Sequence, residues 1–142
     1  MARALVDTGA VVALINSADR YHEQAAGWFR GFRGRLLTTE AVVTESAYVL
    51  AASPLHQRAA LIWVQRAREA GLLQVVPVED HSALARIMSK YADLPCDYAD
   101  ASLVWLAEET GVLQIATIDD GDFSVYRVRG RRRFKILLGQ QP

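Results

Sequence analysis

Short apolar segments alternate with longer segments of helical periodicity along the whole of this chain. Strand-like runs are expected at residues 3–7, 35–38, 72–78, 112–118 and 134–138. Helices are expected at residues 10–17, 21–32, 39–52, 53–70, 80–91 and 97–110, with a polar loop after residue 118. Strands separated by helices are typical of a parallel sheet with crossover helices. We therefore predict an α/β fold in which helices flank both faces of a mainly parallel central sheet.

Several residues mark where these helices should begin and end. Pro54 is tolerated in the first turn of a helix, so Ser53-Pro54 is read as a helix start. Gly71 and Gly111 each follow a helical segment, as is common after a helix C-terminus. Asp19 is a plausible cap for the second helix. With 142 residues and no linker or repeat, residues 1–142 are predicted to form one domain.

The composition excludes several classes of protein. Hydrophobic residues make up 51% of the chain and charged residues 23%, as in ordinary soluble globular proteins. No apolar stretch approaches the roughly 20 residues that span a bilayer, and the N-terminus lacks a secretory signal. The single cysteine, Cys96, excludes an internal disulfide. We expect a cytoplasmic protein without a membrane segment.

The charges balance overall but are unevenly placed. Residues 93–122 contain eight acids and no Lys or Arg, whereas residues 124–142 contain six bases and no acid. Each block could be a solvated surface. An acidic block beside a basic one is also the pattern of a metal site beside an edge that contacts phosphates.

Acidic residues follow two of the predicted strands. Asp7 ends the first strand, and Asp119, Asp120 and Asp122 follow the strand at 112–118. In parallel sheets, ligands bind beyond the carboxyl ends of the strands. Other roles remain open, since Asp7 could cap the helix that follows and the later acids could form a turn.

Further acids lie on two predicted helices. Glu45 lies on the apolar side of its helix, among Val42, Tyr48 and Val49, although it could lean out from the edge of that stripe. Asp100 lies on an inward stripe and too deep to cap its helix, whereas Asp97 is a good N-cap candidate.

Close carboxylates would repel one another and raise each other's pKa unless a cation is bound between them. Ligands that are all oxygen favour Mg²⁺ or Mn²⁺ over Zn²⁺. We therefore predict a Mg²⁺ or Mn²⁺ site built from these acids.

Four segments of the chain together resemble the PIN-domain family of metal-dependent ribonucleases, and within it the VapC-like toxins. They are LVDTGAVVAL, TTEAVVTESAYVL, KYADLPCDYADASLVWLA and ATIDDGDF, and they occur in the family's order over nearly the whole chain. The resemblance implies that Asp7, Glu45, Asp100 and Asp119 are the catalytic and metal-binding acids. It further implies that Asp97 and Asp122 are accessories and that Thr117 orients the site. Gly9 departs from the Ser often found two residues after the first acid.

The function implied is an endoribonuclease that hydrolyses RNA phosphodiester bonds, the toxin of a toxin–antitoxin pair. Its implied partners are RNA, a cognate antitoxin protein and a second copy of the chain in a homodimer. The basic run Arg131, Arg132 and Arg133 could bind RNA phosphates without reading sequence. Two alternatives are a non-catalytic RNA-binding module and a metal-dependent phosphatase, although Gly9 lacks the second acid of a D-x-D phosphatase motif.

Overall fold

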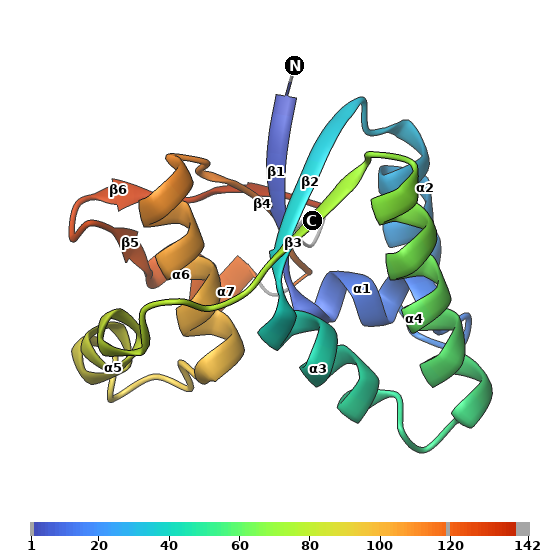
Figure 1. The fold of residues 1–142 in the computed structure, drawn as a ribbon, viewed down its shortest axis with the longest axis horizontal. Coiled ribbons are helices and arrows are strands. Elements are labelled where there is room, and N and C mark those ends of the chain that lie inside the picture. The colour runs from blue at the N-terminus through green and yellow to red at the C-terminus, as the bar shows by residue number, and fades with distance from the viewer. Residues whose placement is uncertain (1, 119, 139–142) are drawn as a thin grey trace.

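The protein is built on a parallel sheet with its first strand at the centre. The structure, a computed structural model, describes residues 2–118 and 120–138, and for Asp120 the backbone only. Within these residues, five parallel strands follow the order β3-β2-β1-β4-β7 (Figure 1). Their bounds are Ala2–Val6 (β1), Gly34–Thr39 (β2), Leu73–Val76 (β3), Gln114–Ala116 (β4) and Lys135–Leu137 (β7). The predicted fold class is confirmed.

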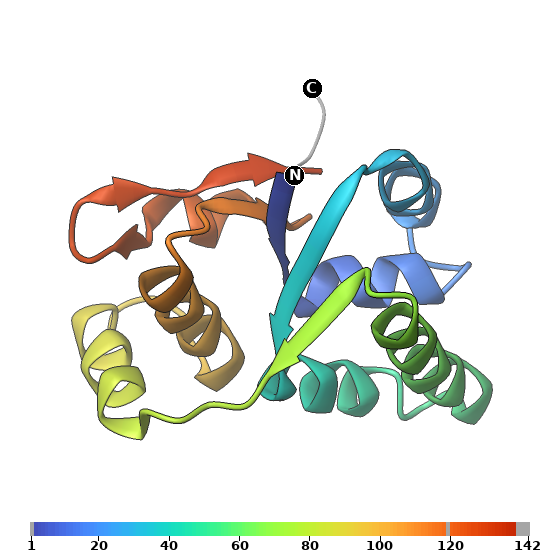
Figure 2. The same cartoon turned by 45° about the horizontal axis from the view of Figure 1, so that its top comes forward.

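Helices cover both faces of this sheet, as Figure 2 shows. Helices α1, α2 and α4 lie against one face, and α5 and α6 lie against the other. Helix α3 lies at the carboxyl end of the sheet, where it contacts both α1 and α6 (Figure 1). The helices span Thr8–Ile15 (α1), His22–Gly31 (α2), Glu40–Val49 (α3), Pro54–Glu69 (α4), His81–Lys90 (α5), Tyr98–Thr110 (α6) and Asp120–Val125 (α7). In the described part of the chain, no helix combines the length and apolar character needed to cross a membrane.

The period of two along each strand divides the core between the two faces. In β1, Leu5 packs with α5 and α6, whereas Ala4 and Val6 pack with α1 and α2. In β2, Leu37 packs on the side of α5 and α6, and Leu36 packs on the side of α1 and α2. Burial on both faces explains why these strands read as continuous apolar runs.

Most helix ends follow the residues that the sequence indicates. Ser53 caps α4 with Pro54 in the first turn, and Gly111 ends α6 with a φ of 74°, a conformation that costs glycine little. The prediction for Asp19 is wrong. Tyr21 occupies the N-cap of α2 without a side-chain bond, and the Asp19 carboxylate instead accepts from the Tyr21 N–H in a tight turn.

The polar loop expected after residue 118 contains more structure than predicted. It includes helix α7 and a hairpin of β5 (Arg127–Val128) and β6 (Arg132–Arg133). The Arg131 N–H bonds to the Val128 carbonyl at 3.2 Å, and the two central residues of this turn, Arg129 and Gly130, have φ values of 52° and 76°. Positive φ at both positions defines a type I′ hairpin turn. Its first position usually holds Asn or Gly, so an Arg-Gly pair gives little hairpin signal.

Candidate acidic site at the strand switch point

The chain leaves β1 toward β2 and later returns to β4 on the other side of β1. The carboxyl ends of β1 and β4 therefore form the topological switch point, where ligands bind in such sheets. Asp7 directly follows β1 and Thr117 directly follows β4. The two meet there, because the Thr117 hydroxyl donates to Oδ2 of Asp7 at 2.5 Å.

Asp7 is both a helix cap and a member of this site. Its Oδ1 accepts from the Ala10 N–H at 2.9 Å, and its side chain caps α1. Only 6% of Asp7 is exposed. The two roles that the sequence left open are compatible, since one carboxylate oxygen faces the helix and the other faces Thr117. These donors offset part of the cost of burying the charge.

Helix α6 brings two further acids to the same place. Asp97 caps the helix by accepting from the Asp100 N–H at 2.9 Å, as predicted for a residue at this position. The pKa of Asp100 is raised to about 7, first by burial and then by the negative charges of Asp97, Asp7 and Asp122. A hydrogen bond from Tyr126 acts in the opposite direction. These causes place Asp100 among the other acids.

Glu45 reaches the site from α3. Burial raises its pKa, and the nearby carboxylate of Asp97 raises it further. The nearby Thr8 hydroxyl lowers it. That contact falls short of full hydrogen-bond geometry, so the buried Thr8 hydroxyl has no complete partner among the described residues.

The predicted apolar stripe around Glu45 is not buried as a whole. Val42 is buried, but Tyr48 is 79% exposed and Val49 is 52% exposed. Helix α3 lies at the end of the sheet, so no helical layer covers its outer side (Figure 1). Glu45 itself is partly buried and lies near Asp97, whereas the apolar stripe on its own helix is largely open.

Tyr126 is a site residue that the sequence analysis missed. Its hydroxyl donates to Oδ2 of Asp100 at 2.9 Å, and its side chain is fully buried. It follows α7 and precedes β5, a stretch that was expected to be a loop. An aromatic residue shortly after the acids was the available signal, but nothing in its spacing linked it to Asp100.

The structure thus brings together most of the predicted site. Asp7, Glu45, Asp97, Asp100, Asp122 and Thr117 lie at or next to the switch point. Asp119 lies outside the described residues. The part of the chain that is described contains no three acidic, histidine or cysteine side chains already close enough to hold a metal ion.

The donor chemistry nevertheless fits a hard divalent cation. Carboxylate and hydroxyl oxygens are the ligands that Mg²⁺ and Mn²⁺ prefer. Glu45, Asp97 and Asp100 form no ion pair with any Lys or Arg of the described residues. The buried Thr8 hydroxyl, with its incomplete hydrogen bonding, supplies a further polar atom beside Asp7. A cation would offset the repulsion that raises the pKa of Asp100 and Glu45.

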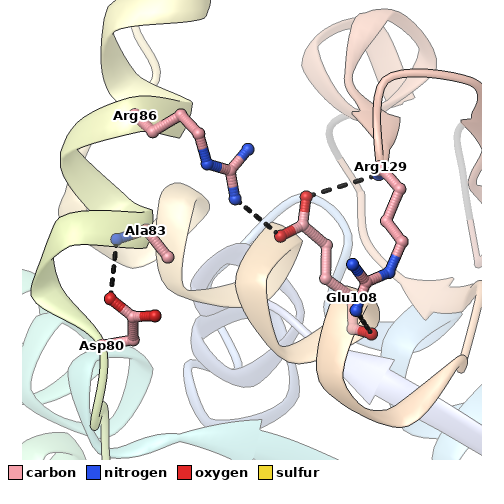
Figure 3. Close-up of polar contacts among 5 residues, drawn as sticks. All are labelled: Asp80, Ala83, Arg86, Glu108 and Arg129. Atoms are coloured by element: carbon pink, nitrogen blue, oxygen red, sulfur yellow. Dashed lines mark hydrogen bonds and ion pairs between the residues drawn. The ribbon is translucent and has the colours of Figure 1, made fainter.

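The β5–β6 hairpin, called here the basic hairpin, is anchored to α6, which an ion pair joins to α5. The Glu108 carboxylate accepts from Arg86 at 2.9 Å and from the Arg129 N–H at 3.3 Å (Figure 3). The Arg129 guanidinium also donates to the Glu108 carbonyl at 3.0 Å. These contacts hold Arg129 in its positive-φ conformation.

The anchored hairpin presents the basic run to solvent. Arg131, Arg132 and Arg133 are all exposed. Arg133 pairs with Arg127, which directly follows Tyr126, so Arg133 lies at the hairpin end nearer to Asp100.

Comparison with known proteins agrees with this geometry. Residues 4–128 match the PIN domain family. Ribonuclease VapC26 of Mycobacterium tuberculosis is 27% identical over 133 residues, which cover 94% of this chain and 98% of that protein. The crystal structure of Mycobacterium tuberculosis VapC20, described as a sarcin-ricin loop cleaving toxin, has a TM-score of 0.72 at 19% identity, covering 84% of this chain and 92% of that one. The predicted resemblance is confirmed, and this chain belongs to the PIN domain family.

Proposed function

We propose that this chain, over residues 1–142, is a metal-dependent endoribonuclease and the toxin of a toxin–antitoxin pair. The observation that carries the proposal is the convergence of carboxylates from the end of β1 and from α3, α6 and α7 at one strand switch point. Within this cluster, Asp100 has a neutral hydroxyl donor, Tyr126, and other acids as its neighbours. Such an arrangement favours a bound cation over an internal ion pair.

Asp7, Glu45, Asp100 and Asp119 would hold the metal, with Asp97 and Asp122 as accessories. A bound Mg²⁺ or Mn²⁺ would activate water and stabilise negative charge on the phosphodiester oxygens. Thr117 fixes one oxygen of Asp7, and Asp97 keeps α6 capped so that Asp100 stays at the start of that helix. The partly exposed Asp100 and Glu45 leave the cluster open to a polymeric substrate.

The basic hairpin would bind the RNA backbone. Arg131, Arg132 and Arg133 are exposed and belong to a hairpin whose near end adjoins Tyr126 and Asp100. Contacts between arginine and phosphate give affinity that does not depend on base sequence and that falls as salt rises. The name of the relative, ribonuclease VapC26, supports RNA as the substrate.

The resemblance to VapC proteins also supports a cognate antitoxin and a homodimer as partners. Exposed apolar side chains on α3 and α4, including Tyr48, Leu55 and Ile62, provide surface that such partners could cover. Analytical ultracentrifugation would measure the oligomeric state, and a monomer at micromolar concentration would contradict the homodimer.

Cleavage of labelled RNA, with Mn²⁺ and with EDTA, tests the proposed activity. We expect the wild type to cleave RNA only with Mn²⁺. Asp100→Asn should abolish cleavage and keep the fold, because it replaces a ligand charge with a neutral side chain of the same shape. Ser82→Ala on the exposed side of α5 is the control and should change the rate by no more than about two-fold.

Three results would contradict the proposal in different ways. Cleavage that persists in EDTA would refute metal dependence. A wild type that binds RNA without cleaving it would favour the non-catalytic alternative. Full activity of Asp100→Asn would show that the site is misplaced.

A further inference from the structure

We propose that Tyr126 is a positioning residue that orients the Asp100 carboxylate for the cation. The inference rests on the proposed function, because it concerns the metal site of that function. Tyr126 lies 26 residues after Asp100 and reaches it from the segment between α7 and β5.

The Tyr126 ring is held on several sides. It is fully buried, and its centroid lies 5.0 Å from that of Tyr91 and 5.1 Å from that of Phe123. The Tyr91 hydroxyl accepts from the N–H of Arg127 at 2.7 Å, which ties down the backbone next to Tyr126. With its ring packed and its backbone tied, the Tyr126 hydroxyl is held beside the Asp100 carboxylate and the Cys96 thiol.

The hydrogen bond that Tyr126 donates goes to one oxygen of Asp100. The hydroxyl donates to Oδ2 at 2.9 Å, whereas Oδ1 of Asp100 accepts no hydrogen bond from any described residue. The bond therefore stops the carboxylate from turning and leaves Oδ1 for a ligand.

The same device appears on Asp7. There the Thr117 hydroxyl donates to Oδ2, as Tyr126 does on Asp100. Carboxylates that bind metals are commonly held by such hydrogen bonds, and removing one typically lowers metal affinity by about 10- to 100-fold. Thr117 was expected to orient the site from the sequence, and Tyr126 is its counterpart on the other side.

The test compares Mn²⁺ binding by Tyr126→Phe and Tyr91→Phe. Each change removes one hydroxyl from the same pair of neighbouring rings, but of the two hydroxyls only that of Tyr126 donates to a carboxylate. Thermal melts at increasing Mn²⁺ give the dissociation constant, and melts in EDTA show that each variant folds. We expect Mn²⁺ affinity to fall about ten-fold in Tyr126→Phe and to change by less than about two-fold in Tyr91→Phe.

A second pair of variants shows whether Tyr126 acts through Asp100. In an Asp100→Asn background, Tyr126→Phe should cause no further loss of Mn²⁺ affinity. An unchanged dissociation constant in Tyr126→Phe, or an equal further loss in the Asp100→Asn background, would overturn the inference. Absence of any Mn²⁺ response in the wild type is a distinct result that would overturn the metal site, and the positioning role with it.

Discussion

Asp100→Asn should stabilise the metal-free protein at neutral and alkaline pH. The carboxylate of Asp100 is partly buried beside Asp97, Asp7 and Asp122, so its charge is costly when no cation is bound. Asparagine removes the charge and keeps the shape, and its side-chain oxygen can still accept from Tyr126. The variant therefore isolates the cost of ionising this one group.

The size of the effect follows from the pKa of Asp100, which is raised from 3.8 to about 7. The folded carboxyl keeps its proton up to about pH 7, whereas the unfolded one releases it near pH 4. Between these values the folded state binds more protons, so wild-type stability falls as pH rises. The pKa difference corresponds to about 4 kcal/mol, and solvent screening of this partly exposed group reduces it to about 2 kcal/mol.

Thermal melts in EDTA from pH 4 to pH 8 measure this difference. At pH 4 the two proteins should melt together, and at pH 8 Asp100→Asn should melt about 6 °C higher. The raised pKa of Glu45 acts on both proteins and largely cancels in the comparison. Asp80→Asn is the matched control, because Asp80 caps α5 outside the acid cluster and Asn caps about as well.

The melting curves can also refute the reasoning. If Asp100→Asn melts at or below the wild-type temperature at pH 8, the charge of Asp100 does not destabilise the metal-free protein. A gap between the two proteins that is the same at pH 4 and pH 8 would point to packing instead of charge. An equal gain in Asp80→Asn would show that the effect is not specific to the cluster.

Three further predictions concern the metal, the basic run and its anchor. Mn²⁺ at a hundred-fold excess over its dissociation constant should stabilise the wild type by about 2.7 kcal/mol. Asp7→Asn should lower this gain, while the asparagine still caps α1. If calorimetry shows the same Mn²⁺ shift in the variant, Asp7 is not a ligand. Replacing Arg131, Arg132 and Arg133 with Ala should weaken RNA binding, measured by fluorescence anisotropy, and should flatten its salt dependence. The control replaces three exposed arginines of α4, which are Arg58, Arg66 and Arg68. Equal weakening in the control would show that any basic surface suffices. Glu108→Gln should lower the free energy of unfolding in urea by about 1 kcal/mol, a small effect because the Arg86 side chain of the ion pair is 59% exposed. Mn²⁺ affinity should not change. A loss of Mn²⁺ affinity would show that the contacts of Glu108 are coupled to the acidic site.

The fold was largely predictable because its signals are local. Apolar runs, Pro54 after Ser53 and Gly111 after α6 each act within a few residues, and they marked elements that the structure contains. The β5–β6 hairpin was not predictable in this way. Its turn uses Arg129 at positive φ, and the compensating contact comes from Glu108, 21 residues earlier.

The site residues likewise divide into those with a local sequence signal and those whose contacts depend on the fold. The position of Asp7 beyond a strand end was predictable because a general rule ties ligands to strand ends, and that of Asp100 inside α6 because Asp97 provides the cap. Tyr126 could not be placed, since its contact with Asp100 depends on how the chain returns after α7. The exposure of Tyr48 was missed because helical periodicity finds an apolar stripe but not whether another layer covers it.

The central position of β1 has a consequence for how the protein is made. The bond between Thr117 and Asp7 joins residues 110 positions apart, and β1 receives β4 as a neighbour only after β2 and β3 exist. At about 5–20 residues per second, Thr117 is synthesised about 5 to 20 seconds after Asp7. A nascent chain therefore carries its first acid long before it can complete the cluster, and a chain released before residue 117 lacks the hydroxyl that binds Oδ2 of Asp7. Translation thus delays the assembled site until nearly the whole protein has been made.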